Sequence, residues 1–334
     1  MQNNEVLTDN FERKHNYLRI SLIEKCNLRC TYCMPADGIL LSPKSNLMQA
    51  DEIYEIAKIF VDNGVDKIRL TGGEPLLRKD FPEIISKLAA LKTEISVTTN
   101  GILIDKHLAV LKQHYIKKIN FSLDTLISSK FQTITLRNQF HKVIDNLHLL
   151  LNNDFKIKIN VVLIKGINDN EIIDFIKLTQ YLPVSIRFIE FMPFAKNDWD
   201  KSKMISYNEI LKQVEHYFLD DEVQKLDDEE HFTAREFKIK NFVGTFGIIS
   251  SITNPFCDGC NRIRLTANGK IKNCLFSNAE TDLLTPFRNG ETIEDLIAFS
   301  IKNKKKIRAG MNTLDDINNP VLNSDNRSMI AIGG

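Results

Sequence analysis

The sequence predicts an α/β fold, an incomplete (βα)6 TIM-type barrel over residues 1–192. A smaller α+β domain over residues 193–334 is expected to cover the barrel mouth. Three observations support this prediction. Strand-like and helix-like segments alternate six times up to Met192, alternate strand positions are polar, and short strands replace the alternation after Met192. A series of β-then-α units favours a parallel sheet with right-handed crossovers.

Six apolar-rich segments are expected to form the strands of this sheet: residues 18–23, 67–70, 94–99, 118–124, 156–164 and 184–192. Helices are expected between them, among them residues 51–61, 138–151 and 171–182. The first two of these helices carry apolar residues at helical spacing along one side, as is typical of a helix that packs on a core.

Polar side chains occupy every second position of the first five predicted strands. They are Arg19, Ser21, Arg69, Thr71, Ser96, Thr98, Asn100, Asn120, Ser122, Asp124, Lys158 and Asn160. A strand places alternate residues on one face, and the apolar face must pack on the helices. Ordinary barrels fill their interior with branched apolar side chains, so a polar, basic interior predicts a cavity for an anionic ligand. The alternative is an open sheet with one wet face.

The six cysteines fall into two triplets, at C-x3-C-x2-C and C-x2-C-x13-C spacing: Cys26, Cys30 and Cys33, then Cys257, Cys260 and Cys274. Three thiolates can hold one iron–sulfur cluster, and one iron then stays open, because such a cluster usually takes four cysteines. Zinc is an alternative, because Cys-x2-Cys is also a zinc spacing. Disulfides are a further alternative, which the expected reducing compartment disfavours.

Composition and charge exclude several classes of partner. The chain has 334 residues, 44 basic and 43 acidic, with a formal net charge of +1. This balance gives no support for binding to nucleic acid or to a membrane surface. The start of the chain is polar and no long apolar run follows, so we expect a cytoplasmic protein. The basic run at residues 302–308 is interpreted as a solvated helix end.

A hairpin is expected in the second half of the chain. Asn268-Gly269 is a strong signal for a hairpin turn. It follows Arg262 and Arg264, which the period of two places on the same face of the first hairpin strand.

Two motifs resemble the radical S-adenosylmethionine (SAM) superfamily. The first is the loop Cys26-x3-Cys30-x2-Cys33 with Tyr32 before its last cysteine, and the second is Gly72-Gly73-Glu74-Pro75 at the end of the second strand. The second triplet, the segment 261–265 and the terminal Gly333-Gly334 resemble one family within it. That family is the GTP 3′,8-cyclases of molybdenum-cofactor biosynthesis, and the resemblance covers residues 19–334.

The resemblance implies two [4Fe–4S] clusters, SAM as cofactor and GTP as substrate. Cys26, Cys30 and Cys33 would hold the first cluster, and Cys257, Cys260 and Cys274 the second. The positions that match SAM contacts are Tyr32, through its backbone carbonyl, and Gly73, Ser122 and Met192. Those that match GTP contacts are Arg19, Arg69, Thr98, Lys158, Arg262, Ile263 and Arg264. The terminal Gly333 and Gly334 are expected to reach the active site and to act there in catalysis or in ordering the substrate.

The implied reaction is the cyclisation of GTP to 3′,8-cyclo-7,8-dihydro-GTP, the first step of molybdenum-cofactor biosynthesis. A 5′-deoxyadenosyl radical takes hydrogen from C3′ of the ribose, and the ribose radical then attacks C8 of guanine. The implied partners are an electron donor, a second copy in a homodimer, and the next pathway enzyme, cyclic pyranopterin monophosphate synthase. Two alternatives are a peptide-modifying radical SAM enzyme with an auxiliary cluster and a non-catalytic iron–sulfur carrier.

Overall fold

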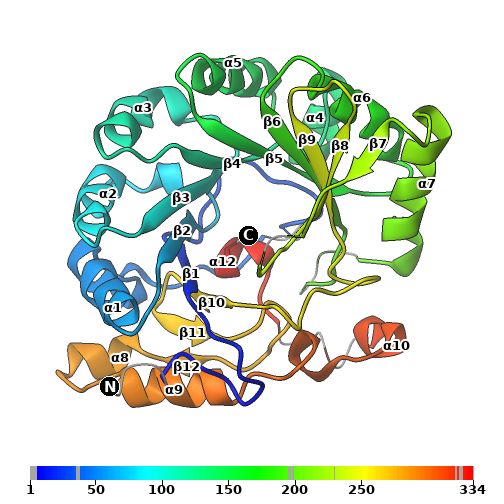
Figure 1. Cartoon of the computed structure of the whole chain (residues 1–334). Helices are drawn as coiled ribbons and strands as arrows, with labels where there is room; N and C mark the ends of the chain where they lie inside the picture. The colour runs from blue at the N-terminus through cyan, green and yellow to red at the C-terminus, as the bar shows by residue number, and fades with distance from the viewer. Residues whose placement is uncertain are drawn as a thin grey trace.

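A computed structural model describes residues 6–34, 38–194, 197, 199–228, 230–319, 322 and 326–333. Its strands form one 12-stranded sheet in the order β12-β11-β10-β1-β2-β3-β4-β5-β6-β9-β8-β7. The sheet curves round a central space, and helices lie along its outer side (Figure 1). This arrangement confirms the predicted α/β fold with a partial barrel.

The barrel consists of six parallel strands in sequence order. They are β1 (Tyr17–Ser21), β2 (Lys67–Thr71), β3 (Glu94–Thr99), β4 (Lys118–Ser122), β5 (Lys156–Leu163) and β6 (Val184–Glu190). The outer helices are α1 (Ala50–Asp62), α2 (Phe81–Ala89), α3 (Ile104–Gln113), α4 (Ser128–Thr135), α5 (Phe140–Leu151) and α6 (Ile172–Leu178). The predicted helix at 171–182 is wrong at its end, because α6 stops at Leu178. The carbonyl of Thr179, the first residue after α6, accepts the backbone amide of Gly244 at 2.8 Å instead of extending the helix.

The later part of the chain extends both edges of the same sheet. β9 (Thr245–Ile249) pairs in parallel with β6, and β10 (Arg262–Leu265) pairs in parallel with β1. The outermost strands are antiparallel: β7 (Val223–Lys225), β8 (Arg235–Ile239), β11 (Lys270–Lys272) and β12 (Thr281–Asp282). The β10–β11 pair confirms the predicted hairpin at Asn268-Gly269. A domain boundary at residue 192 stays a prediction.

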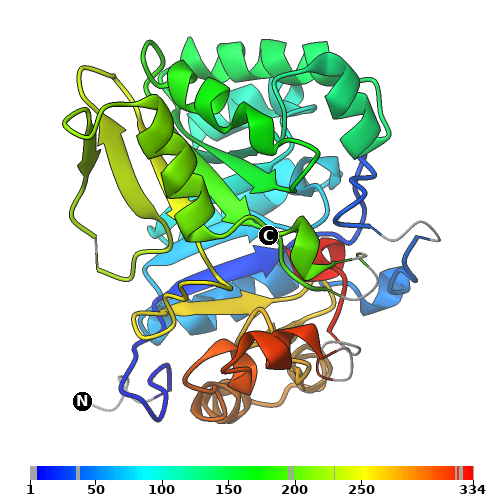
Figure 2. The same cartoon turned by 90° about the vertical axis from the view of Figure 1, so that its right-hand side faces the viewer.

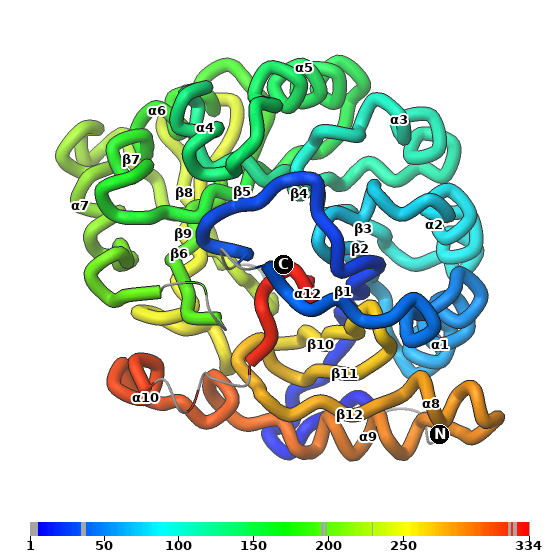
Figure 3. Tube along the Cα trace, turned by 180° about the vertical axis from the view of Figure 1, so that it is seen from behind, coloured from blue at the N-terminus to red at the C-terminus, as the bar shows by residue number. Residues whose placement is uncertain are grey.

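The remaining helices cover one side and the mouth of the barrel. They are α7 (Tyr207–Tyr217), α8 (Leu284–Arg288), α9 (Glu294–Lys302), α10 (Leu314–Asn318) and α12 (Met329–Ile332). The short α12 lies in the middle of the barrel opening (Figure 2), whereas α8 and α9 lie along β12 and α10 lies beyond the end of α9 (Figure 3). The amino-terminal segment contacts the end of α9, where Asn10 donates a hydrogen bond to the carbonyl of Lys302. No helix within the described ranges has both the length and the apolar character needed to cross a bilayer.

The outward-facing strand residues form the main core with the helices. The fully buried members on three strands include Leu18, Ile20, Ile68, Leu70, Ile119 and Phe121. Part of the inward-facing set is also buried, since Arg19, Ser21, Ser96 and Asn120 are each at most 9% exposed. Other inward residues of β2–β5, among them Arg69, Thr98 and Ser122, are half-buried. The polar face is therefore an enclosed interior, and the alternative of an open sheet with a wet face is wrong.

The interpretation of residues 302–308 as a solvated helix end is also wrong in part. α9 ends at Lys302, and Lys302, Lys305 and Lys306 are exposed as expected. Lys304 and Arg308, however, are only 4% and 6% exposed. The chain turns inward after α9, and backbone carbonyls satisfy both cations: Arg308 donates to Ile252, Met311 and Asn312, and Lys304 to Arg262.

Candidate functional site

The barrel interior holds a cavity of about 310 Å³ that both cysteine triplets line. Inward residues of β1–β6 form one part of its wall, and residues from the loops and strands after β6 form the rest. Two groups of cysteines that lie far apart in the sequence thus meet in one space. The volume falls within the range typical of small-molecule pockets.

The first triplet lies on the loop that follows β1. The amides of Cys33 and Met34 both donate to the carbonyl of Cys30 at 3.0 Å, which closes a tight turn. The Cys26 sulfur accepts from the Leu28 amide at 3.4 Å. Burial, together with the neighbouring sulfurs and carboxylates, raises the pKa of Cys26 to about 11 and that of Cys33 to about 12. A bound metal reverses this preference, because it binds the deprotonated thiolate.

The second triplet lies in a cationic environment. Cys257 and Cys260 precede β10, Cys274 follows β11, and the Cys260 amide donates to the Cys257 carbonyl at 3.1 Å. Lys304 places its ammonium 3.4 Å from the Cys260 sulfur. Burial acts to raise the pKa of Cys260, but Arg262 and Lys304 outweigh it and hold that pKa well below its usual range.

The chemistry of these donors fits iron–sulfur clusters. All six cysteines are free thiols, which removes the disulfide alternative. Within the described part of the chain, no three His, Cys, Asp or Glu side chains gather as closely as a single metal ion requires. In a cluster each thiolate binds a different iron atom, so the sulfurs need to face a common space rather than a common point. Each triplet meets that condition in the cavity wall.

The Gly72-Gly73-Glu74-Pro75 turn joins the first cysteine loop to the sheet. The backbone amide of Gly73 donates to the carbonyl of Ile23 at 2.7 Å, and that of Glu74 donates to the carbonyl of Lys25 at 2.8 Å. A Cβ atom on Gly73 would lie 2.2 Å from the Lys25 carbonyl oxygen, so only glycine permits this approach. The buried Glu74 carboxylate accepts from the Thr99 hydroxyl and the Asn100 amide, each at 2.8 Å. The motif therefore fixes the loop that carries Cys26 against β2 and β3.

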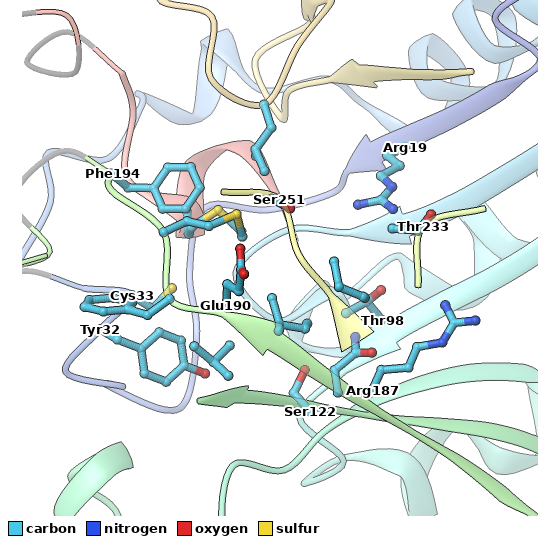
Figure 4. A pocket seen from close by; sticks show the side chains of 18 of the residues that line it. Arg19, Tyr32, Cys33, Thr98, Ser122, Arg187, Glu190, Phe194, Thr233 and Ser251 are labelled. Atoms are coloured by element: carbon cyan, nitrogen blue, oxygen red, sulfur yellow. The ribbon is translucent and has the colours of Figure 1, made fainter. Parts of the chain in front are cut away.

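All four residues that match SAM contacts line the cavity: Tyr32, Gly73, Ser122 and Met192. The Tyr32 hydroxyl donates to Asp124 at 2.7 Å, and Asp124 accepts from the Val162 amide at 2.9 Å. Burial raises the pKa of Asp124 to about 6. These bonds fix Tyr32, which lies beside Cys33 on the left of Figure 4.

Five of the seven residues that match GTP contacts also line the cavity: Arg19, Arg69, Thr98, Arg262 and Arg264. Ile263 alternates with the two arginines of β10 and is buried in the apolar core on the other face. Lys158 is half-buried on β5 and does not line the cavity. Burial and, to a smaller extent, the nearby Arg187 lower its pKa to about 8.

Several buried polar atoms on the barrel's inner face lack a hydrogen-bond partner. Within the described residues these include Arg19 Nε, Thr98 Oγ1, Asn120 Oδ1 and Arg187 Nε. Unpaired buried polar groups are uncommon in folded proteins and call for a ligand or water. Their position indicates that a polar ligand is held among the arginines.

Sequence reasoning missed Arg187, which lines the cavity from β6. In Figure 4 it lies with Arg19 at the end opposite Tyr32 and Cys33, and it is paired with Glu236 at 2.8 Å. The signal was present, since Ser185 and Arg187 alternate with the buried Ile186 and Phe188. The same period of two had identified the inward residues of the first five strands.

The carboxy-terminal segment enters the site between the two triplets. Ser328 donates its hydroxyl hydrogen to the Cys33 carbonyl at 2.7 Å, and Met329 lines the cavity. The Arg264 guanidinium donates to the carbonyl of Gly333. Gly333 has φ +73° and packs on Thr71, at the carboxyl end of β2, so closely that a Cβ atom would overlap it. Gly334 lies outside the described residues.

The partial βα barrel, the three-cysteine loop after β1 and the Gly-Gly-Glu-Pro turn after β2 are the defining features of a radical SAM protein. The radical SAM superfamily profile matches residues 20–179, and the profile "Molybdenum Cofactor Synthesis C" matches residues 184–309. The solved structure of Streptococcus suis SuiB has a similar fold, with a TM-score of 0.61 at 17% identity. The structural match covers 90% of this chain and 68% of the SuiB chain.

Similar proteins identify the family within the radical SAM superfamily to which the chain belongs. A mitochondrial GTP 3′,8-cyclase of Arabidopsis thaliana is 43% identical over 99% of this chain and 84% of its own length. The GTP 3′,8-cyclase of Peptoclostridium acidaminophilum is 41% identical over 92% of this chain and 94% of its own. Human molybdenum cofactor biosynthesis protein 1 is 45% identical over 94% of this chain, which spans only 50% of the human protein. The chain belongs to the GTP 3′,8-cyclase family.

Proposed function

We propose that this chain cyclises GTP to 3′,8-cyclo-7,8-dihydro-GTP, the first step of molybdenum-cofactor biosynthesis. The observation that carries the proposal is the single cavity lined by both cysteine triplets and by buried arginines between them. Two relatives that match most of this chain carry the name GTP 3′,8-cyclase. A one-cluster electron carrier would need neither the second triplet nor an arginine-lined interior.

One part of the cavity is suited to SAM. Cys26, Cys30 and Cys33 would hold the cluster that binds it, and Cys257, Cys260 and Cys274 would hold a second. When bound, these groups supply one-electron chemistry and the 5′-deoxyadenosyl radical. Gly73, Ser122, Met192 and the Tyr32 backbone would orient SAM. The hydrogen bond between Tyr32 and Asp124 supports this assignment, because it fixes the backbone of the cysteine loop.

The other part of the cavity is suited to a nucleoside triphosphate. Arg19, Arg69, Arg262 and Arg264 converge from three neighbouring strands, and a guanidinium binds phosphate oxygens through two parallel hydrogen bonds. Burial lowers the pKa of Arg69 to about 10, which still leaves it charged at neutral pH. Thr98 and Lys158 would add a hydroxyl and an ammonium. The enclosed site would hold the ribose near the radical and exclude water.

The terminal glycines would complete the site. The hydrogen bond from Arg264 to Gly333 and the packing of Gly333 on Thr71 support a role for the tail beside the substrate. Deleting Gly333 and Gly334 is expected to abolish cyclisation while SAM cleavage persists. A normal product yield from the truncated chain would refute this role.

Anaerobic reconstitution tests the proposal as a whole. We expect about eight irons per chain, SAM cleavage that depends on GTP, and a cyclised nucleotide found by mass spectrometry. Arg262→Ala and Arg264→Ala should retain their iron while cyclisation falls, and the exposed Lys302→Ala is the matched control. About four irons, or cleavage without GTP, would favour a peptide-modifying enzyme. Iron without SAM cleavage would favour an electron carrier, and zinc without iron a scaffold.

Further partners follow from the same family assignment. We infer an electron donor, a homodimer, and transfer of product to cyclic pyranopterin monophosphate synthase, in the cytoplasm. Size-exclusion chromatography with light scattering tests the dimer. A reconstituted assay with the next enzyme tests the transfer.

A further inference from the structure

Tyr17 is a buried aromatic residue at the start of β1, behind the arginines of the cavity. It is 6% exposed and points to the barrel interior, because it alternates with Arg19 along the strand. Its hydroxyl forms no hydrogen bond of normal geometry within the described residues, although it lies close enough to the Arg19 side chain to affect its pKa. Tyr17 does not line the cavity, whereas Arg19 and Arg69 do.

Three cations surround the Tyr17 ring. The guanidinium carbons of Arg19 and Arg69 lie 5.4 and 5.2 Å from the ring centroid, and the Lys67 ammonium lies 5.1 Å from it. All three distances lie within the range of cation–π attraction. The strand register produces this cluster, because Tyr17 pairs with Lys67 on β2 and Arg19 pairs with Arg69.

An aromatic ring can stabilise the two arginines without forming an ion pair with them, whereas a carboxylate cannot. Burial lowers the pKa of Arg19 and of Arg69, and the nearby Arg262 acts in the same direction on both, whereas Tyr17 acts to raise both. An aromatic face attracts such cations without neutralising them. A carboxylate would pair with the arginines and compete with an anionic ligand. Across the described residues, neither Arg19 nor Arg69 forms an ion pair, whereas Lys67 is paired with Glu94 at 2.9 Å.

We propose that Tyr17 is a positioning residue whose ring holds Arg19 and Arg69 unpaired and in place for the phosphates of the nucleotide. This inference rests on the proposed function, because it takes the anion to be the triphosphate of the substrate. The ring carries the effect, so the hydroxyl is dispensable. The contribution of Tyr17 to binding affinity depends on the phosphates of the ligand, so it is absent when the ligand is a nucleoside.

The test compares Tyr17→Leu and Tyr17→Phe with the parent chain, all reconstituted anaerobically. Equilibrium dialysis measures the binding of GTP and of guanosine. Tyr17→Leu is expected to bind GTP at least about tenfold more weakly, since it loses two buried cation–π contacts to the arginines. It should bind guanosine as the parent does, and Tyr17→Phe should stay within about twofold of the parent for both ligands. In turnover, KM for GTP should rise more than kcat falls.

Phe155→Leu is the matched control, because it removes a buried ring with a lysine ammonium 4.7 Å from its centroid, outside the cavity. It should leave GTP affinity unchanged. The inference is overturned if Tyr17→Leu keeps the parent's GTP affinity, or if its affinities for guanosine and for GTP fall by the same factor. It is also overturned if Tyr17→Phe loses as much GTP affinity as Tyr17→Leu. GTP binding by the parent chain is measured before any variant is compared. If the parent chain does not bind GTP, the proposed function itself is refuted.

Discussion

In the metal-free protein, Cys260 is expected to react with iodoacetamide faster than Cys26 or Cys33. The thiolate is the reactive form of cysteine. Burial raises the pKa of Cys26 to about 11 and that of Cys33 to about 12. Arg262 and Lys304 overcome burial at Cys260 and hold its pKa well below its usual range.

The size of the difference follows from the ionised fractions. At pH 8 a thiol with a pKa of about 11 is ionised to about one part in a thousand, whereas the lowered pKa of Cys260 favours its thiolate form. Nucleophilicity falls as the pKa falls, which offsets part of this advantage. We therefore expect Cys260 to be alkylated about tenfold faster than Cys26, measured by peptide mass spectrometry over time. In urea the reactivities of the two cysteines should converge.

Lys304→Met tests the cause. The ammonium lies 3.4 Å from the Cys260 sulfur, where attraction to a thiolate is on the order of 5 kcal/mol at an effective dielectric of about 20. Screening and relaxation reduce this value, but a change of ~1.4 kcal/mol already alters the ionisation equilibrium tenfold. We expect alkylation of Cys260 to slow several-fold in this variant. The exposed Lys302→Met should leave the rate unchanged.

Two results would refute this reasoning. One is that Cys26 or Cys33 is alkylated as fast as Cys260 in the folded protein. The other is that Lys304→Met and Lys302→Met alkylate at the same rate as the parent.

Three further predictions concern the cavity and its supports. Burial lowers the pKa of Lys158 to about 8, so GTP binding should weaken as pH rises through 8, because the amine loses the charge that the triphosphate favours. Titration calorimetry should show a flatter pH profile for Lys158→Arg, and an unchanged profile would exclude Lys158. The buried Glu190 accepts the Ile252 amide at 2.8 Å, so Glu190→Gln should destabilise the fold by about 1–3 kcal/mol in urea unfolding; equal midpoints would contradict this. Gly73→Ala should reduce iron retention, because its Cβ would lie 2.2 Å from the Lys25 carbonyl; parental iron content would count against the role of this turn.

The barrel was predictable because the pattern that identifies its strands lies within short segments of the sequence. The period of two in the strands distinguished inward from outward residues, and in the structure the outward set is buried in the core while inward residues of each strand line the cavity. Element ends were less certain, as the early stop of α6 shows. A helix end depends on contacts such as the hydrogen bond from the Gly244 amide to the Thr179 carbonyl, which joins distant parts of the chain.

The residues that sequence reasoning missed or misread act through non-local contacts. Lys304 was interpreted as part of a solvated helix end, yet it is buried against Cys260. Tyr17 carried no motif, and only the register of β1 with β2 places its ring among three cations. Neither contact leaves a periodic signal, because each joins segments that fold together only in the complete sheet.

The sequence by itself predicted the kinds of ligand this protein can hold. Cysteine spacing within each triplet and polar alternation within each strand are local properties, and they predicted iron–sulfur binding and an anionic ligand. The tertiary structure alone decided that both triplets line one cavity. That arrangement depends on β9 pairing with β6 and β10 pairing with β1, because these pairings bring the second triplet across the mouth of the barrel.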